Sequence, residues 1–217
     1  MEIARALLLA GAEPDALSDM YGAECTTMTL LVSSSHPAEA GLQVPLIDLL
    51  LSFGAALEGR GTRKWGAPLV TALTFGMVDA ANALASYGAR IDLPAAAGLG
   101  RMDEAASLLP FANAQARHRA FSLAAQHGHA DIVRLLLDAG EDPNRYNHEG
   151  HHAHATPLHQ AVLGGHEAVV RLLVERGARL DIRDTIWHST PLGWALHASG
   201  KANEQMAGCL RSLGAAE

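Results

Sequence analysis

The sequence predicts an all-α repeat solenoid, in which antiparallel helix pairs stack on one another and short hairpins join them. The first sign is a repeated pattern of residues whose closing glycines, Gly140 and Gly177, lie 37 residues apart. The second is that each copy holds two short apolar runs at helical spacing. The third is composition, since 49% of residues are hydrophobic but only 5% are aromatic, as small contacts between thin helix pairs require. A period of this size is typical of stacked supersecondary units.

The N-terminal half of the chain holds the less regular copies. Residues 7–12 match the second half of a repeat whose first half is absent, so we expect one helix there with a bare apolar face. A missing upstream repeat would cover that face. Residues 26–55 form a degenerate copy with an insertion near 36–41, and residues 67–89 form a regular one.

The C-terminal half holds the clearer copies. Residues 95–109 match a repeat that lacks its closing glycine, and two strong copies follow in 119–144 and 156–181. The last copy, 190–215, is about three residues longer between its helices. The sequence therefore predicts about six repeats and one half-repeat, in a single continuous domain over 1–217.

The copy that begins at Thr156 shows how each unit is expected to form. Thr156 can cap a helix, and Pro157 suits the first helical position because its φ is fixed and its N–H is absent. Gly165 is expected to end the first helix in a left-handed conformation, and Gly177 to end the second in the same way. Neither helix can cover its own apolar stripe, so the next repeat must do so.

The motif itself resembles one family. Thr156-Pro157-Leu158-His159-Gln160-Ala161 reads T-P-L-H-x-A, and with its neighbours it makes the chain resemble ankyrin-repeat proteins over essentially its whole length. The match is most specific in 119–193. The sequence of residues 183–188, just before Thr190, is similar to that of bacterial ankyrin proteins of the cytoplasm. The resemblance implies a non-enzymatic scaffold that binds a protein or peptide in the groove formed by its hairpins and first helices.

The positions that line that groove follow from the resemblance. They precede the threonine position and the mid-repeat glycine of each copy: Arg63, Lys64, Trp65, Thr74, Phe75, Gln115, His118, Gln126, His127, His152, Leu163, Gly164, Ile186, Trp187, His188 and His197. Exposed Trp, Phe and Arg side chains are common interface anchors. The alternative for Trp65 and Trp187 is local packing over a neighbouring hairpin.

The histidines raise a second possibility. His148-Glu149-Gly150-His151-His152 satisfies H-E-x-x-H, but the match falls in an expected hairpin, where its side chains are not held on one helical face. We therefore expect no metalloprotease. Metal binding or a pH response by the loop 148–154 remains the alternative function. His129, His159 and His166 match family positions that bond neighbouring loops, so we expect them to be structural.

Other features limit the function classes. The net charge of −7 does not indicate the basic surface that binds nucleic acid or anionic membranes. No stretch of the sequence is long and apolar enough to span a bilayer. Cys25 and Cys209 are expected to be free thiols in a reducing compartment, which favours a cytoplasmic monomer. No phosphate loop, nucleophile elbow or C-x-x-C motif occurs, so we expect no cofactor. The binding fragment of a larger enzyme is the remaining alternative.

Overall fold

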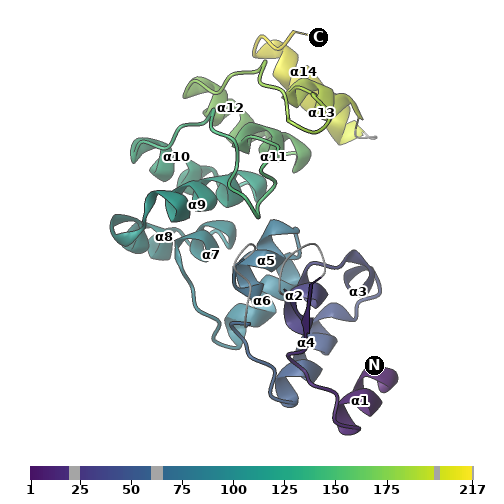
Figure 1. The fold of residues 1–217 in the computed structure, drawn as a ribbon. Helices are drawn as coiled ribbons and strands as arrows, with labels where there is room; N and C mark the ends of the chain where they lie inside the picture. The colour runs from purple at the N-terminus through teal and green to yellow at the C-terminus, as the bar shows by residue number, and fades with distance from the viewer. Residues whose placement is uncertain (20–24, 60–65, 198–200, 217) are drawn as a thin grey trace. The chain divides into compact units, whose positions relative to one another are not determined.

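The computed structural model describes residues 1–19, 25–59, 66–197 and 201–216, and it is mostly helical (Figure 1). Its contacts divide the chain into two compact units, Met1–Ile91 and Asp92–Glu217. The single domain predicted over 1–217 stays a prediction. No helix in the described residues is both long enough and apolar enough to cross a membrane.

Unit 1 begins with a lone helix and a short ladder. Strands β1 and β2 pair antiparallel, with Leu17 opposite Thr26 and Ser18 opposite Cys25. The insertion predicted near 36–41 forms the short helix α3 and the turn after it. The elements are α1 (Glu2–Leu9), β1 (Leu17–Ser18), β2 (Cys25–Thr26), α2 (Thr27–Val32), α3 (Ser35–Glu39), α4 (Gln43–Ser52), α5 (Pro68–Thr74) and α6 (Val78–Ser86).

Unit 2 is a succession of helix pairs. Where the closing glycine is missing, a short 3-10 helix follows α8 instead. The elements are α7 (Leu93–Gly98), α8 (Met102–Leu108), η2 (Leu109–Phe111), α9 (Ala114–Gln126), α10 (Ala130–Asp138), α11 (Pro157–Leu163), α12 (Glu167–Glu175), α13 (Pro191–His197) and α14 (Lys201–Ser212). Counting both units, the described residues hold the predicted half-repeat and six helix pairs.

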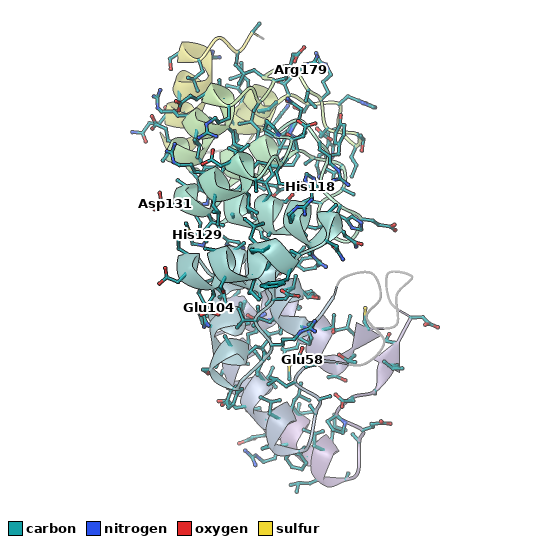
Figure 2. The ribbon with its side chains drawn as sticks, turned by 90° about the vertical axis from the view of Figure 1, so that its left-hand side faces the viewer. Glu58, Glu104, His118, His129, Asp131 and Arg179 are labelled. Atoms are coloured by element: carbon teal, nitrogen blue, oxygen red, sulfur yellow. The ribbon has the colours of Figure 1, made fainter. Side chains whose placement is uncertain are left out.

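The first helices of successive pairs form one layer of unit 2, and the second helices form another. Helix α9 packs between α7 and α11, and α11 packs against α13, while α10 contacts both α8 and α12. Many contacts are made by alanines, and Phe121 on α9 is the largest fully buried side chain. Figure 2 shows the side chains of Arg179 and His118 on one side of this unit and those of Asp131 and Glu104 on the other.

The local physics of the pair α11–α12 matches the expectation. Thr156 and His159 form a reciprocal capping box, and Pro157 takes the first helical position. Gly165 has φ +73° and Gly177 has φ +91°, so both adopt the left-handed conformation that ends a helix. The prediction for these helix boundaries is confirmed.

The histidines of two Gly-His pairs form hydrogen bonds between neighbouring repeats. His129 Nε2 lies 3.0 Å from the Gly98 carbonyl oxygen, and His166 Nε2 lies 2.8 Å from that of Gln126. The imidazole of His166 lies so close to Gly128 that a Cβ there would come within 2.5 Å of it. The structural role predicted for these two histidines is therefore confirmed, because each bonds the carbonyl that ends the first helix of the preceding repeat.

Amide hydrogen exchange is expected to be fastest at α1 and α8. No residue of α1 is buried, and α8 buries Ala105 alone, whereas α12 buries four residues. A linear stack opens first where its nearest-neighbour contacts are weakest. Exchange followed by mass spectrometry should show α1 and α8 deuterated well before α11 and α12. Equal protection of all four helices would contradict this.

Candidate functional site

A groove of about 1380 Å³ lies between the last two helix pairs of unit 2, α11–α12 and α13–α14, and the hairpins before them. We call it the terminal groove. Residues of the hairpin before α13, of α11, of α13 and of the chain end at Gly214 and Ala216 line it. Five of the predicted groove residues lie on its wall: His152, Leu163, Trp187, His188 and His197.

Apolar side chains that solvent reaches gather around this groove. Leu163 is 58% exposed, Trp187 65% and Leu196 52%. They come from α11, the hairpin and α13, so three separate elements bring them together. Such a gathering of exposed apolar residues, beside polar ones, is typical of an interaction site.

Trp187 rests against an aromatic cluster at the same time. Its ring centroid lies 6.0 Å from that of Trp194 and 5.2 Å from that of His154, with near-perpendicular planes to the histidine. His159 contacts Trp194 edge-on at 5.0 Å. One side of Trp187 thus packs locally, as the alternative reading of this residue expected, while most of its surface stays exposed. Packing on one side fixes the orientation of the exposed side.

Asp184 holds the hairpin that carries Trp187. Its buried carboxylate accepts hydrogen bonds from the backbone N–H groups of Ile186, Trp187 and Ser189, and from the indole N–H of Trp194, at 2.7–3.0 Å. Burial raises the pKa of this carboxyl, but the four hydrogen bonds outweigh burial and lower it to about 2. The ionised carboxylate therefore fixes both tryptophans relative to each other.

Two histidines of the groove hold an unusual backbone conformation. His152 has φ +46° and His188 has φ +53°, and within the described ranges they are the non-glycine residues with positive φ. Glycine would adopt this conformation without the steric cost of a side chain. Both hairpins thus turn where an imidazole is placed on the groove wall.

Among the described residues, the groove wall carries one cation, Arg183, and one carboxylate, Asp181. Arg183 Nη1 donates to the His188 carbonyl at 2.8 Å, which leaves other guanidinium N–H groups. The carboxylate of Asp181 accepts two hydrogen bonds from Arg179, at 3.0 and 2.9 Å. Gln160 is 2% exposed, and its Nε2 has no hydrogen-bond acceptor within the part of the chain that the structure describes.

The other predicted groove residues do not line this groove. Phe75 is 38% exposed and belongs to unit 1. Ile186 is exposed on the same hairpin but does not line the groove, and Gln126 and His127 are half-buried at the end of α9. Gln115 and Gly164 are exposed on α9 and at the end of α11. Arg63, Lys64 and Trp65 lie outside the described residues.

Two expected groove positions are wrong. His118 is fully buried, with Nδ1 3.0 Å from Glu141 and Nε2 3.0 Å from the Tyr146 carbonyl. The reason is that Asn113 caps α9 earlier than the repeat pattern implies, which places His118 inside a longer helix. Thr74 is also buried, and its hydroxyl donates to the Val70 carbonyl at 2.9 Å.

The histidine loop 148–154 is not helical, as predicted from its glycine and the proline before it. His151 is buried, and burial together with the charges of His152, Arg119, His127 and His118 lowers its pKa well below the usual value. Among the described residues, no group of three His, Cys, Asp or Glu side chains is arranged to hold a metal ion.

Protein purified without a histidine tag is expected to hold less than one zinc ion per chain. The rings of His151 and His152 lie 5.5 Å apart and those of His152 and His154 lie 6.0 Å apart, but His151 is buried, and the described residues form no group of three side chains that could hold a metal ion. Elemental analysis measures the metal content directly. One tightly bound zinc per chain that a His152→Ala, His154→Ala variant loses would overturn this expectation.

Capped helix pairs, hairpin connections and a groove built by several repeats define a helical repeat scaffold, which binds through its surface. The family model described as "Ankyrin repeats (3 copies)" matches residues 93–184 and 121–207, which is more than half of the chain. The chain therefore belongs to the ankyrin-repeat family. Ankyrin repeats generally mediate protein–protein interactions, and the family is typically non-enzymatic.

Individual relatives match shorter stretches. The chain is 42% identical over 62 residues to an ankyrin repeat-containing protein, P1E11.10, of Schizosaccharomyces pombe. It is 33% identical over 87 residues to the inactive serine/threonine-protein kinase TEX14 of Mus musculus, and 38% identical over 72 residues to inversin of Danio rerio. These matches cover 29%, 40% and 32% of this chain, and 28%, 6% and 7% of the relatives.

The sequence pattern did not point to three residues that build the groove. Trp194 and Gln160 occupy positions that the repeat motif leaves open, so no pattern marks them. Asp184 carried a usable signal, because it lies 37 residues after the buried Asn147 and both begin their hairpins. A buried polar residue at the same place in two repeats indicates a carboxylate or amide that bonds the hairpin backbone.

Proposed function

We propose that this chain is a protein-interaction module that binds its partner in the terminal groove. The observation that carries the proposal is the gathering of Leu163, Trp187 and Leu196, each more than half exposed, around one groove. Exposed apolar residues cost solubility, and a partner that covers them removes that surface from water. Trp187 is the expected central anchor, because its hairpin is held by Asp184 before any partner binds.

We further propose that the chain acts as a monomer in the cytoplasm and carries no catalytic site of its own. Both cysteines are buried free thiols, which agrees with a reducing compartment. The net charge of −7 disfavours nucleic acid as the partner. Light scattering of the purified chain tests the monomer.

Trp187→Ala is expected to weaken partner binding about 30-fold or more, as for a hot-spot tryptophan worth about 2 kcal/mol. A pull-down with the wild-type chain and with Trp187→Ala identifies proteins that depend on the groove, and a binding titration with the strongest of them gives the loss. The stability of the free chain should fall much less, because 65% of the side chain is exposed.

The matched control is a change on α12, outside the groove. Arg171 is exposed and pairs with Glu167 at 2.7 Å, so Arg171→Gln removes a charge without placing like charges together. We expect this variant to bind as the wild type does. A loss of affinity in Arg171→Gln, with full binding by Trp187→Ala, would place the binding surface on the second helices instead.

A further inference from the structure

We infer that the partner of the terminal groove is an α-helix with an apolar stripe, which packs on α13 as the first helix of a further repeat would. This inference rests on the proposed function, since it names the element that the partner brings to the same groove. Equivalent positions in successive first helices carry it, because α13 exposes a side that the other first helices of unit 2 bury against a neighbour.

One side of each first helix faces the repeat that follows it. In α9, the hydroxyl oxygen of Ser122 lies 2.7 Å from the side-chain oxygen of Asn147, in the next hairpin. The equivalent residue of α11 is His159, whose Nε2 lies 3.2 Å from the carbonyl oxygen of Ser189, again in the next hairpin. Residues three positions apart share one side of a helix, so Ala125 and Val162 also face the following repeat.

The position of Val162 is apolar and buried where another first helix follows in unit 2. Helix α7 packs against α9, α9 against α11, and α11 against α13. The residues at this position are buried in all three: Ala97 in α7, Ala125 in α9 and Val162 in α11. The equivalent residue of α13 is Leu196, because it follows Thr190 as Val162 follows Thr156, and it is 52% exposed. A large apolar side chain thus lies uncovered where the stack elsewhere places a helix.

This side of α13 forms part of the groove wall. Gly193 and Leu196 both line the terminal groove, at the positions of His159 and Val162 in α11. Gly193 has no side chain to bond the backbone of a further hairpin, as His159 does. The side therefore offers the apolar contact that a helix makes, without the polar contact that a hairpin makes.

Backbone hydrogen bonding also favours a helix over an extended segment. A helix bonds most of its backbone N–H and C=O groups internally, whereas an extended segment needs partners for them. The strands among the described residues, β1 and β2, belong to unit 1, so the part of the groove that the structure describes offers no strand edge. A helix needs only the apolar contact of Leu163, Trp187 and Leu196, each of which is more than half exposed.

The test is a selection of random peptides displayed on phage against the whole purified chain. Peptides of about 18 residues are long enough to form a helix. We expect the enriched peptides to share apolar residues at positions i, i+3, i+4 and i+7. A fluorescent copy of the most enriched peptide is then titrated with the chain, and circular dichroism should show that it gains helix on binding. A proline in the middle of the peptide should weaken binding by about tenfold or more, and added salt should change the affinity little because the contact is apolar.

Variants of Leu196 separate recognition from folding. Leu196→Glu places a charge on the exposed side of α13 and should weaken the peptide by about tenfold or more. Leu196→Ala adds no charge and should weaken it in the same direction, with the melting temperature of both variants compared with the wild type. The matched control is Leu9→Glu, the same change at an exposed leucine of α1 in unit 1, which should leave the affinity unchanged.

The outcomes also distinguish this inference from the function on which it rests. If the enriched peptides depend on Trp187 but gain no helix, or if both Leu196 variants bind them as the wild type does, the helical occupant is wrong and the groove remains the binding site. If no peptide is enriched, or if the chain self-associates and Leu196→Glu makes it monomeric, the inference is overturned; in the second case a second copy covers α13. If protein partners and peptides both bind Trp187→Ala at full affinity, the proposed function itself is wrong.

Discussion

Leu172→Ala is expected to lower the free energy of unfolding by about 2–5 kcal/mol. Leu172 lies on α12 and is 4% exposed, in a helix that packs against α10 and α11. The substitution removes buried methyl groups and leaves a cavity that two flanking helices cannot easily close. Urea denaturation followed by circular dichroism gives the change, with Arg171→Ala, exposed on the same helix, as a control that should change it by less than about 0.5 kcal/mol.

Gly177→Val tests the same repeat by another route. Gly177 has φ +91°, and a Cβ built there would meet nothing within 4 Å. The free energy of unfolding should therefore fall by about 1–3 kcal/mol because of the backbone conformation, which a side chain rarely adopts. If both Leu172→Ala and Gly177→Val unfold at the wild-type urea midpoint, the repeat boundaries described here are wrong.

The features of this repeat that could be predicted from the sequence are local ones. Thr156, Pro157, Gly165 and Gly177 each satisfy a conformational requirement of their own position, so their residue types alone predict where the helices begin and end. The bonds of His129 and His166 could be inferred only through the family resemblance. Their partners are backbone carbonyls of another repeat, which no residue type marks.

The groove could be predicted only in part. Leu163, Trp187, His188 and His197 occupy exposed positions that follow from the repeat register, and they line it. His118 was misplaced because a single cap, Asn113, starts α9 early, so that His118 lies inside the helix and is buried instead of standing in a hairpin. A register argument fails wherever one side chain shifts a helix start.

The aromatic cluster around Trp187 and Trp194 also could not be predicted from the sequence. It depends on the four hydrogen bonds that Asp184 accepts, one of them from Trp194, ten residues further along. A sequence shows the residues of such a network but not the angles at which hairpin and helix meet. The identity of Gln160 as a buried donor likewise depends on what surrounds it in three dimensions.

The stability of the fold is expected to fall in two steps as the solution is acidified. His159 is responsible for a large part of the first step. It is buried, and burial lowers its pKa to about 4, although the Ser189 carbonyl and the charge of Asp184 act in the opposite direction and His154 adds to the lowering. The ring accepts from the Thr156 N–H at Nδ1 and faces the Ser189 carbonyl with Nε2, so the fold requires its neutral form.

The direction of the first step follows from counting protons. Between about pH 6.5 and pH 4 the unfolded chain protonates this histidine while the folded chain does not, so the unfolded state binds more protons. The free energy of unfolding therefore falls as pH falls through this window, by about 3 kcal/mol from His159. His129, His151 and His154 also have lowered pKa values and act in the same direction.

Asp184 contributes to the second step, at lower pH. Its pKa of about 2 in the folded chain lies below the usual value, so its contribution is complete above about pH 4 and is lost as pH falls toward 2. The two residues therefore act in adjoining windows, although both make the chain less stable in acid. A loss between pH 6.5 and 4 reports buried histidines and not this carboxylate.

Urea denaturation at pH 6.5 and at pH 4 tests the first step. We expect the wild type to lose several kcal/mol between the two, and His159→Gln to lose about 3 kcal/mol less, because the variant has no imidazole to protonate when it unfolds. His197→Gln is the matched control, since His197 is exposed at the end of α13 and its side chain meets solvent in both states. Equal losses in the wild type and His159→Gln would mean that the capping box tolerates a charged ring.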